Sequence, residues 1–239
     1  MCHMIFRQLF DPDTSSFSYL FGCERSGTAA LVDPVRETAD RDLALIAGLG
    51  LRLTHCFETH IHADHISGSW HLRELTGCRI ACPAMDHLPC ADIAVSEESA
   101  IGVGSITFHP LFTPGHTDSH HCYRVDDGNS TTRVCTGDSL LIDGCGRTDF
   151  QSGDAATLYR SVREKLFSLP DDTLVFPAHD YHGRRVSTIA QERARNPRLG
   201  GARTLDEFVV LMASLDLPYP RMIDVAVPAN RACGTAIQG

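Results

Sequence analysis

The segment Thr59-His60-Ile61-His62-Ala63-Asp64-His65 places three imidazoles and one carboxylate within seven residues. It directly follows the apolar run at residues 51–57, which predicts a β-strand. A strand that ends in such a turn presents several side chains at one edge of a sheet. Histidine is the commonest metal ligand in proteins, and carboxylate is its usual companion. The segment therefore predicts a metal centre.

Three further strand ends carry residues of the same kind. His116 follows Thr113-Pro114-Gly115, Asp138 follows Cys135-Thr136-Gly137, and His179 follows Pro177-Ala178. The glycines allow the backbone to turn tightly and aim the next side chain inward. Unrelated surface or capping roles would not explain four such strand ends in one chain. The candidate ligands are His60, His62, Asp64, His65, His116, Asp138 and His179.

The alternation of strand and helix patterns along the chain predicts an α/β (α+β) fold. We expect one domain over residues 1–239, in which two sheets face each other and helices cover the outer faces, an αββα four-layer sandwich. A turn is predicted at residues 126–129. Strands are predicted at residues 5–10, 18–23, 29–32, 51–57, 79–82, 103–112, 122–125, 133–136 and 173–176. Helices are predicted at 38–49, 67–76, 155–168, 187–195 and from Thr204, which opens a capping box.

Composition limits the partners and the location. The 239 residues carry a net charge of -9, which argues against nucleic acid because phosphate binding needs a basic surface. No stretch approaches the length of a membrane-spanning apolar helix. The first residues lead directly into a predicted strand, without a signal or transit pattern. We therefore expect a cytoplasmic protein, or one of the mitochondrial matrix if a transit peptide has been removed.

The ten cysteines are spread over the whole chain, and several lie within apolar runs. A reduced cysteine in such a position behaves as a small hydrophobic residue. The sequence therefore predicts reduced thiols rather than a disulfide framework.

With these residues the sequence resembles the metallo-β-lactamase superfamily, whose signature is HxHxDH followed by a later His, an Asp and a final His. Four stretches resemble its persulfide dioxygenase branch, the ethylmalonic encephalopathy protein family, more closely. They are residues 138–150, which contain GCGRTDF, residues 177–183 (PAHDYHG), Asn196-Pro197-Arg198 and residues 227–234 (VPANRACG). The resemblance implies a metallo-β-lactamase sandwich in a single domain.

Two members of this superfamily use the candidate ligands differently. In a zinc thioester hydrolase of glyoxalase II type, all seven hold two metals and Asp138 bridges them. In the persulfide dioxygenases, the resemblance implies one non-haem iron(II) per chain, bound by His60, His116 and Asp138. His62, Asp64, His65 and His179 would then orient the ligands through hydrogen bonds. Spacing alone leaves both alternatives open, together with a non-catalytic metal-binding or sulfur-carrier module.

The resemblance implies that the enzyme oxidises glutathione persulfide with dioxygen and water to sulfite and glutathione, in the detoxification of hydrogen sulfide. Arg147, Tyr181 and Cys145 are the candidate substrate contacts. Arg147 is chosen because a guanidinium group binds the carboxylates of glutathione bidentately, and Tyr181 because it lies two residues after His179. The resemblance implies that Cys145 is a pocket-lining thiol. Arg147 could equally pair with Asp149. The resemblance also suggests a homodimer. Weaker candidates for substrate contact are Arg184, Arg198, Asn230 and Arg231.

Overall fold

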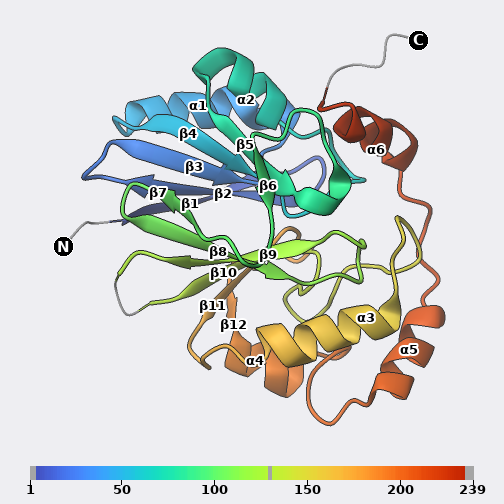
Figure 1. Cartoon of the computed structure of the whole chain (residues 1–239). Helices are drawn as coiled ribbons and strands as arrows, with labels where there is room; N and C mark the ends of the chain where they lie inside the picture. The colour runs from blue at the N-terminus through green and yellow to red at the C-terminus, as the bar shows by residue number, and fades with distance from the viewer. Residues whose placement is uncertain (1–3, 129–130, 235–239) are drawn as a thin grey trace.

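The computed structural model describes residues 4–128 and 131–234 and contains two six-stranded sheets packed face to face. Helices cover both outer faces (Figure 1), so the αββα sandwich in one domain is confirmed. The terminal residues of the predicted 1–239 span, 1–3 and 235–239, lie outside the described part.

The first sheet contains the six N-terminal strands in sequence order. It begins with antiparallel strands and continues with parallel ones from β3 onward. Its strands are β1 (Met4–Asp11), β2 (Ser16–Cys23), β3 (Thr28–Val32), β4 (Arg52–Phe57), β5 (Arg79–Pro83) and β6 (Ile93–Val95).

The second sheet has the order β12-β11-β10-β9-β8-β7. Only β10 and β11 run parallel to each other, and the remaining neighbours are antiparallel. Its strands are β7 (Ile101–Val103), β8 (Ile106–Phe112), β9 (His121–Asp126), β10 (Arg133–Gly137), β11 (Leu174–Pro177) and β12 (Ser187–Thr188).

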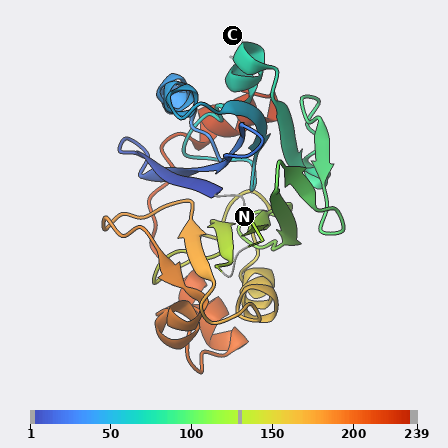
Figure 2. The ribbon, with the colours of Figure 1, turned by 90° about the vertical axis from the view of Figure 1, so that its left-hand side faces the viewer.

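The helices divide between the two sheets, as the views in Figures 1 and 2 show. Those on the side of the first sheet are α1 (Ala39–Gly48), α2 (Ser69–Thr76) and α6 (Ile223–Arg231). Those on the side of the second sheet are α3 (Ala155–Arg160), α4 (Ile189–Arg195) and α5 (Leu205–Ala213). A π-helical segment, Ser161–Leu166, continues α3, and short 3-10 turns occur at Arg36–Thr38 and Ala84–Asp86.

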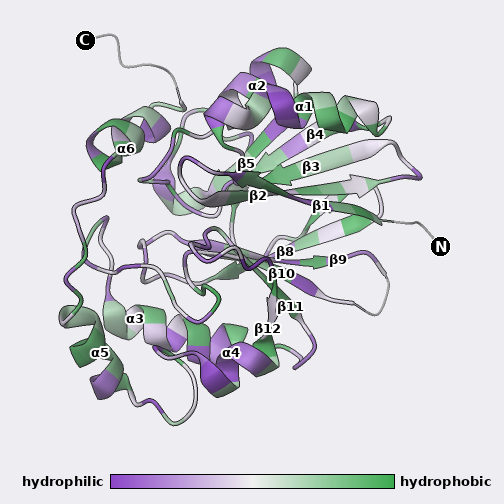
Figure 3. Ribbon diagram, turned by 180° about the vertical axis from the view of Figure 1, so that it is seen from behind, coloured by the Kyte–Doolittle hydropathy of each residue, from purple (hydrophilic) through white to green (hydrophobic). Residues whose placement is uncertain are grey.

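Aromatic side chains fill the space between the sheets. Phe57 of β4 and Phe108 of β8 stack with their ring centroids 4.3 Å apart, and Tyr123 of β9 meets Phe57 edge-on. All three are fully buried, and burying such a side chain contributes about 1.5–3 kcal/mol. Figure 3 shows the strands coloured mainly as hydrophobic, whereas α4 is coloured largely as hydrophilic. Strand β2 is buried along its whole length, because one face packs against the second sheet and helices cover the other.

Most predicted elements are confirmed, and the differences have local causes. The predicted strand at 103–112 is a hairpin of β7 and β8 that turns at Gly104, where φ is +62°. The predicted helix at 187–195 begins only at Ile189, because Ser187–Thr188 pairs with β11 as β12. Two elements, β6 and α6, escaped the sequence analysis, and Pro228 lies inside α6. The predicted turn at 126–129 ends on a residue outside the described part.

The prediction of reduced thiols is wrong for one pair of cysteines. Cys90 and Cys233 form a disulfide across a sequence separation of 143 residues, which no local pattern could indicate. Cys56, Cys122 and Cys135 are thiols with fully or nearly fully buried side chains, as predicted. The disulfide joins the segment after α6 to the loop before β6.

No helix in the described part of the chain is long and apolar enough to span a bilayer.

The strand directions bring the candidate ligands to one edge of the sandwich. The parallel strands β3 and β4 end at the same edge of the first sheet. In the second sheet β10 and β11 are parallel, and β8 runs in the same direction because two antiparallel pairings separate it from β10. The loops after β4, β8, β10 and β11 therefore meet at this edge.

Candidate metal centre

The loop that carries the HxHxDH motif is fixed to both sheets before the first histidine. Glu58 donates its N–H to Ala81 of β5 at 2.9 Å, and its carbonyl accepts from the Tyr123 hydroxyl at 2.8 Å. The carbonyl of Thr59 accepts from the N–H of His121 at 2.9 Å. These bonds explain why a polar loop enters the interior with a defined conformation.

His60, His116 and Asp138 come together as one group. Each offers one ligand atom, and these atoms all lie within 4.8 Å of one another. His116 Nε2 is 3.4 Å from Asp138 Oδ2, and the rings of His60 and His116 are perpendicular with centroids 4.9 Å apart. The three residues predicted as ligands from three different strand ends are thus neighbours in the fold.

Hydrogen bonds fix which ring nitrogens are free to bind a metal. His116 Nδ1 donates to the carbonyl of Arg147 at 2.8 Å. His60 Nδ1 donates to Thr59 Oγ1 at 2.9 Å, and that hydroxyl donates in turn to Asp33 Oδ2 at 2.9 Å. The Nε2 atoms of both rings therefore remain as acceptors, in the usual arrangement of metal-binding histidines.

The donor set fits a divalent transition metal. Asp138 Oδ1 is buried and has no hydrogen-bond partner among the described residues. Burying a carboxylate oxygen in this way costs free energy unless a bound cation interacts with it. Burial, aided by the neighbouring His62 and His116, lowers the pKa of His60 well below its usual value, so the ring is neutral and able to act as a ligand. Two imidazoles and one carboxylate form a ligand set with open positions.

His179, Asp64 and His65 lie beside this triad. His179 Nε2 is 3.8 Å from Asp138 Oδ1 and 3.5 Å from Asp64 Oδ2. His65 Nδ1 is 2.8 Å from Asp64 Oδ2, which also accepts from the Ser16 hydroxyl at 2.8 Å. Burial alone would raise the pKa of Asp64, but His65 and His179 hold it well below its usual value. Asp64 is therefore a half-buried carboxylate in its charged form.

The ring of His62 directs its Nε2 away from the triad, toward two carboxylates. Its Nε2 lies 3.1 Å from Asp33 Oδ1 and 3.4 Å from Glu58 Oε2, so these three residues form a separate buried cluster. Burial opposes protonation of His62, but the carboxylates of Asp33 and Glu58 raise its pKa well above the usual value. Neither carboxylate was predicted as a site residue. The sequence signals that could have indicated them are the Asp33-Pro34 pair directly after β3 and the acidic residue Glu58 directly before Thr59.

His120 has a supporting role that its sequence position did not reveal. Its Nε2 accepts from the N–H of Asp138 at 3.1 Å, and its Nδ1 lies 3.0 Å from Ser139 Oγ. Gly137 has φ +49°, and a Cβ there would lie 2.4 Å from His120 Nε2. Only glycine therefore permits this contact, which fixes the backbone that carries the candidate ligand Asp138.

A large open pocket leads to the triad and contains the predicted substrate contacts. Its wall includes Arg147, Tyr181 and Cys145 together with Arg184 and Arg198. Asn230 instead lines a small cavity behind the metal-binding loop. The pocket is wide enough to admit a ligand with several polar groups.

The three predicted substrate contacts differ in how far their side chains are free to bind a substrate. Arg147 donates to both carboxylate oxygens of Asp149 at 2.7 Å and to the carbonyl of Pro218 at 2.8 Å. Tyr181 is 69% exposed and stacks on the ring of His179 with centroids 5.9 Å apart. Burial raises the pKa of the Cys145 thiol to about 11, although nearby Arg198 acts in the opposite direction. All three line the pocket, and their role with substrate stays a prediction.

The two-sheet fold and its buried histidine–carboxylate cluster define a metal-binding protein of αββα architecture. A model described as Metallo-beta-lactamase superfamily matches residues 11–179. Persulfide dioxygenase ETHE1, mitochondrial, of Homo sapiens is 47% identical over 232 residues, which cover 97% of this chain and 89% of that protein. The crystal structure of ETHE1 from Myxococcus xanthus aligns with a TM-score of 0.93 and 50% identity, covering 97% of this chain and 100% of that one.

A hydroxyacylglutathione hydrolase of Rhodospirillum rubrum is 35% identical over 195 residues, which cover 81% of this chain and 73% of that protein. The similarity to the hydrolase is lower and extends over less of the chain, so the hydrolase alternative is not favoured. The chain belongs to the persulfide dioxygenase branch of the metallo-beta-lactamase superfamily.

Proposed function

We propose that this protein is an iron(II)-dependent persulfide dioxygenase that oxidises glutathione persulfide with dioxygen and water to sulfite and glutathione. The similarity to ETHE1 proteins over 97% of the chain supports persulfide oxidation. The grouping of His60, His116 and Asp138, together with the hydrogen bond between His62 Nε2 and Asp33 Oδ1, is the observation that favours one metal with three protein ligands. His62, Asp64 and His65 form a second group of possible ligand atoms, and the metal content of the protein tests whether that group holds an ion.

The proposed ligands are His60, His116 and Asp138, because the free Nε2 atoms of the two rings lie close to the carboxylate of Asp138. An iron(II) ion bound by two imidazoles and one carboxylate supplies open coordination positions for dioxygen and a sulfur ligand. The protein contributes the orientation. The carbonyl of Arg147 and the hydroxyl of Thr59 hold the two rings, while the His120 ring holds the backbone of Asp138. His62, Asp64, His65 and His179 are proposed as supporting residues.

Glutathione carries two carboxylates, and arginines of the pocket would bind them. Arg147 and Arg184 already contact acidic residues, Asp149 and Asp143 respectively. Arg198 donates to the carbonyl of Cys145 at 2.8 Å, and no hydrogen bond from its Nε or Nη2 to another described residue is present. Arg198 therefore joins Arg147 as a proposed carboxylate clamp. Tyr181 at the pocket mouth would contact the peptide part of the substrate.

Two measurements test the proposal. Metal analysis should find about one iron per chain, since the three-ligand set is a mononuclear arrangement. An oxygen electrode should then record oxygen uptake by the iron-loaded protein when glutathione persulfide is added, with sulfite as product. Absence of oxygen uptake would reject the dioxygenase. Two zincs per chain together with thioester hydrolysis would favour the hydrolase.

The oligomeric state and the cellular compartment of the protein are proposals as well. A homodimer is expected to elute in size-exclusion chromatography with light scattering at twice the 26.2 kDa chain mass. Cell fractionation would decide between the cytoplasm and the mitochondrial matrix. Elution at the chain mass would remove the dimer from the proposal.

A further inference from the structure

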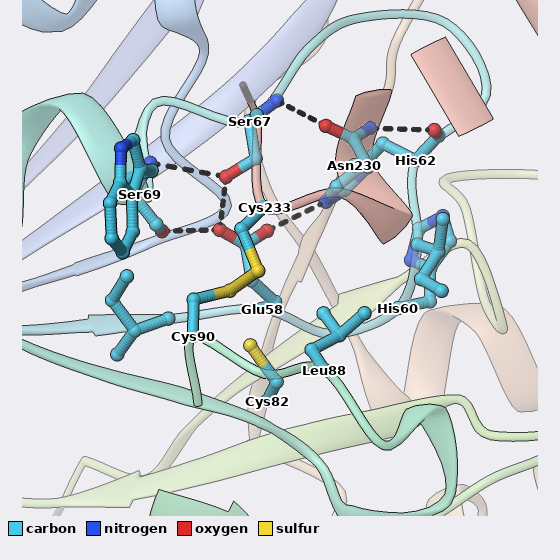
Figure 4. Close-up of a pocket in the computed structure, with 14 residues that line it drawn as sticks. Glu58, His60, His62, Ser67, Ser69, Cys82, Leu88, Cys90, Asn230 and Cys233 are labelled. Atoms are coloured by element: carbon cyan, nitrogen blue, oxygen red, sulfur yellow. Dashed lines mark hydrogen bonds and ion pairs between the residues drawn. A yellow bond between two sulfur atoms is a disulfide. The ribbon is translucent and has the colours of Figure 1, made fainter. Parts of the chain in front are cut away.

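Glu58 is a buried carboxylate that directly follows β4 and lies two residues before the first histidine of the HxHxDH motif. Its side chain lies in the small cavity behind the metal-binding loop (Figure 4). Oε1 accepts hydrogen bonds from the hydroxyls of both Ser67 and Ser69. The two serines hold one oxygen in place, and this leaves the other oxygen to face the loop.

The second oxygen of Glu58 faces His62. Oε2 is buried and has no hydrogen-bond partner among the described residues, and it lies 3.4 Å from His62 Nε2. The same nitrogen is 3.1 Å from Asp33 Oδ1, so His62 lies between two carboxylates. A Nε2–H directed at this pair is stabilised by both charges.

We propose that Glu58 is a positioning residue that keeps His62 out of the ligand set of the metal, and that it thereby favours iron over zinc at this centre. The inference rests on the proposed function, because it takes His60, His116 and Asp138 as the ligands of a single metal. It adds a residue outside the motif that determines how many imidazoles reach the ion.

The position of His62 explains why it must be restrained. Its ring centroid is 4.2 Å from that of His60, and its Nδ1 is 4.0 Å from Asp64 Oδ1. Nδ1 is buried and unpartnered among the described residues. Rotation of an unrestrained ring would bring a nitrogen toward neighbouring ligand atoms. A fourth protein ligand would favour the tetrahedral closed set that suits zinc, at the expense of the open positions.

The backbone of the loop is also held by groups other than the Glu58 side chain. Asn230 of α6 donates through Nδ2 to the carbonyl of His62 at 2.9 Å, and its Oδ1 accepts from the N–H of Ser67 at 2.8 Å (Figure 4). Nδ2 also donates to the carbonyl of His65 at 2.9 Å. The disulfide between Cys90 and Cys233 anchors the segment that follows α6. A change at Glu58 is therefore expected to alter the direction of the His62 ring rather than the course of the loop.

Glu58→Gln tests the contact with little change in shape. The amide oxygen of the glutamine can still accept hydrogen bonds from Ser67 and Ser69. Its NH2 group would then face the Nε2–H of His62, so that two donors meet and the contact is unfavourable. The apo proteins are loaded anaerobically with equimolar iron(II) and zinc, and the bound metals are measured by mass spectrometry. Changes in groups that orient ligands alter metal affinity about 10- to 100-fold, so the zinc-to-iron ratio should rise at least about tenfold in Glu58→Gln.

A double variant separates positioning from a general structural effect. If Glu58 acts through His62, then Glu58→Gln/His62→Ala should have the same zinc-to-iron ratio as His62→Ala alone. Visible absorption of the cobalt(II)-loaded proteins provides a second readout, and the more intense bands of four-coordinate cobalt are expected only in Glu58→Gln. Glu97→Gln, an exposed carboxylate that contacts Lys165, serves as a surface control.

An unchanged ratio in folded Glu58→Gln, or a raised ratio that persists without His62, would overturn the inference. If Glu58→Gln does not fold, Glu58→Asp withdraws the carboxylate from His62 without removing its charge and should shift the ratio in the same direction. Two zincs and no iron in the wild-type protein would instead refute the proposed function, whatever the variants show.

Discussion

His116 Nδ1 and the carbonyl oxygen of Arg147 are 2.8 Å apart, which joins a proposed metal ligand to the loop that carries a proposed substrate contact. The bond uses the backbone of Arg147, while its side chain extends into the pocket. Arg147 thus contacts the proposed metal site through its backbone and the substrate pocket through its side chain. A side-chain substitution should therefore leave the orientation of His116 intact.

Arg147→Ala should raise KM for glutathione persulfide with little change in kcat. A hydrogen bond to a charged group contributes about 1.5–3 kcal/mol, so we expect a KM at least about tenfold higher. Steady-state oxygen uptake measures both constants. Asp149→Asn is the matched variant, because it removes the ion pair but keeps the guanidinium. Equal KM values in the two variants would mean that Arg147 acts only through Asp149.

Asp138→Ala should abolish iron retention. The carboxylate is the one anionic member of the proposed ligand triad, and its Oδ1 is a buried acceptor with no hydrogen bond among the described residues. Iron per chain after desalting is the measurement. Asp171→Ala, an exposed carboxylate paired with Arg193, should retain the wild-type iron content. Normal iron content in folded Asp138→Ala would exclude Asp138 as a ligand.

The motif residues could be predicted because each follows an apolar strand directly, and strand ends that point the same way meet at one edge. The roles of Asp33, Glu58 and Asn230 could not be predicted, because these roles come from tertiary contacts. The bond from Ser67 to Asn230, for example, spans 163 residues. Helix α6 escaped prediction because Pro228 is unfavourable in a helix interior on propensity alone. Local rules therefore indicated the proposed ligands but not the groups that contact them from distant parts of the chain.

Cys145 should resist alkylation in the native protein. Burial raises the pKa of its thiol to about 11, so the thiolate, which is the reactive form, is scarce at pH 8 and becomes abundant only as the pH rises through that value. Peptide mass spectrometry after iodoacetamide treatment at pH 8 should show Cys145 unlabelled. The same treatment in urea should label it. Rapid native labelling at pH 8 would mean that Cys145 is a reactive pocket thiol instead.

The disulfide between Cys90 and Cys233 should stabilise the protein measurably. A cross-link over a long loop restricts the unfolded chain, and its removal typically costs about 2–4 kcal/mol. Urea unfolding of Cys90→Ser/Cys233→Ser should show this loss in the free energy of unfolding. Reductant should lower the stability of the wild type and leave that of the double variant unchanged. A wild type that is insensitive to reductant would contradict the prediction.

Asn230→Asp should weaken the metal-binding loop from a distance. The carboxylate can still accept from the N–H of Ser67 but can no longer donate to the carbonyls of His62 and His65. Each buried carbonyl left unpaired costs about 1–3 kcal/mol, so unfolding should require less urea. Because these carbonyls flank Asp64, hydrogen exchange at residues 60–66 should also become faster. Asn230→Ala, which loses the acceptor as well, should be destabilised further. Exchange rates that rise only within α6, and not in the loop, would show that Asn230 supports its own helix rather than the metal site.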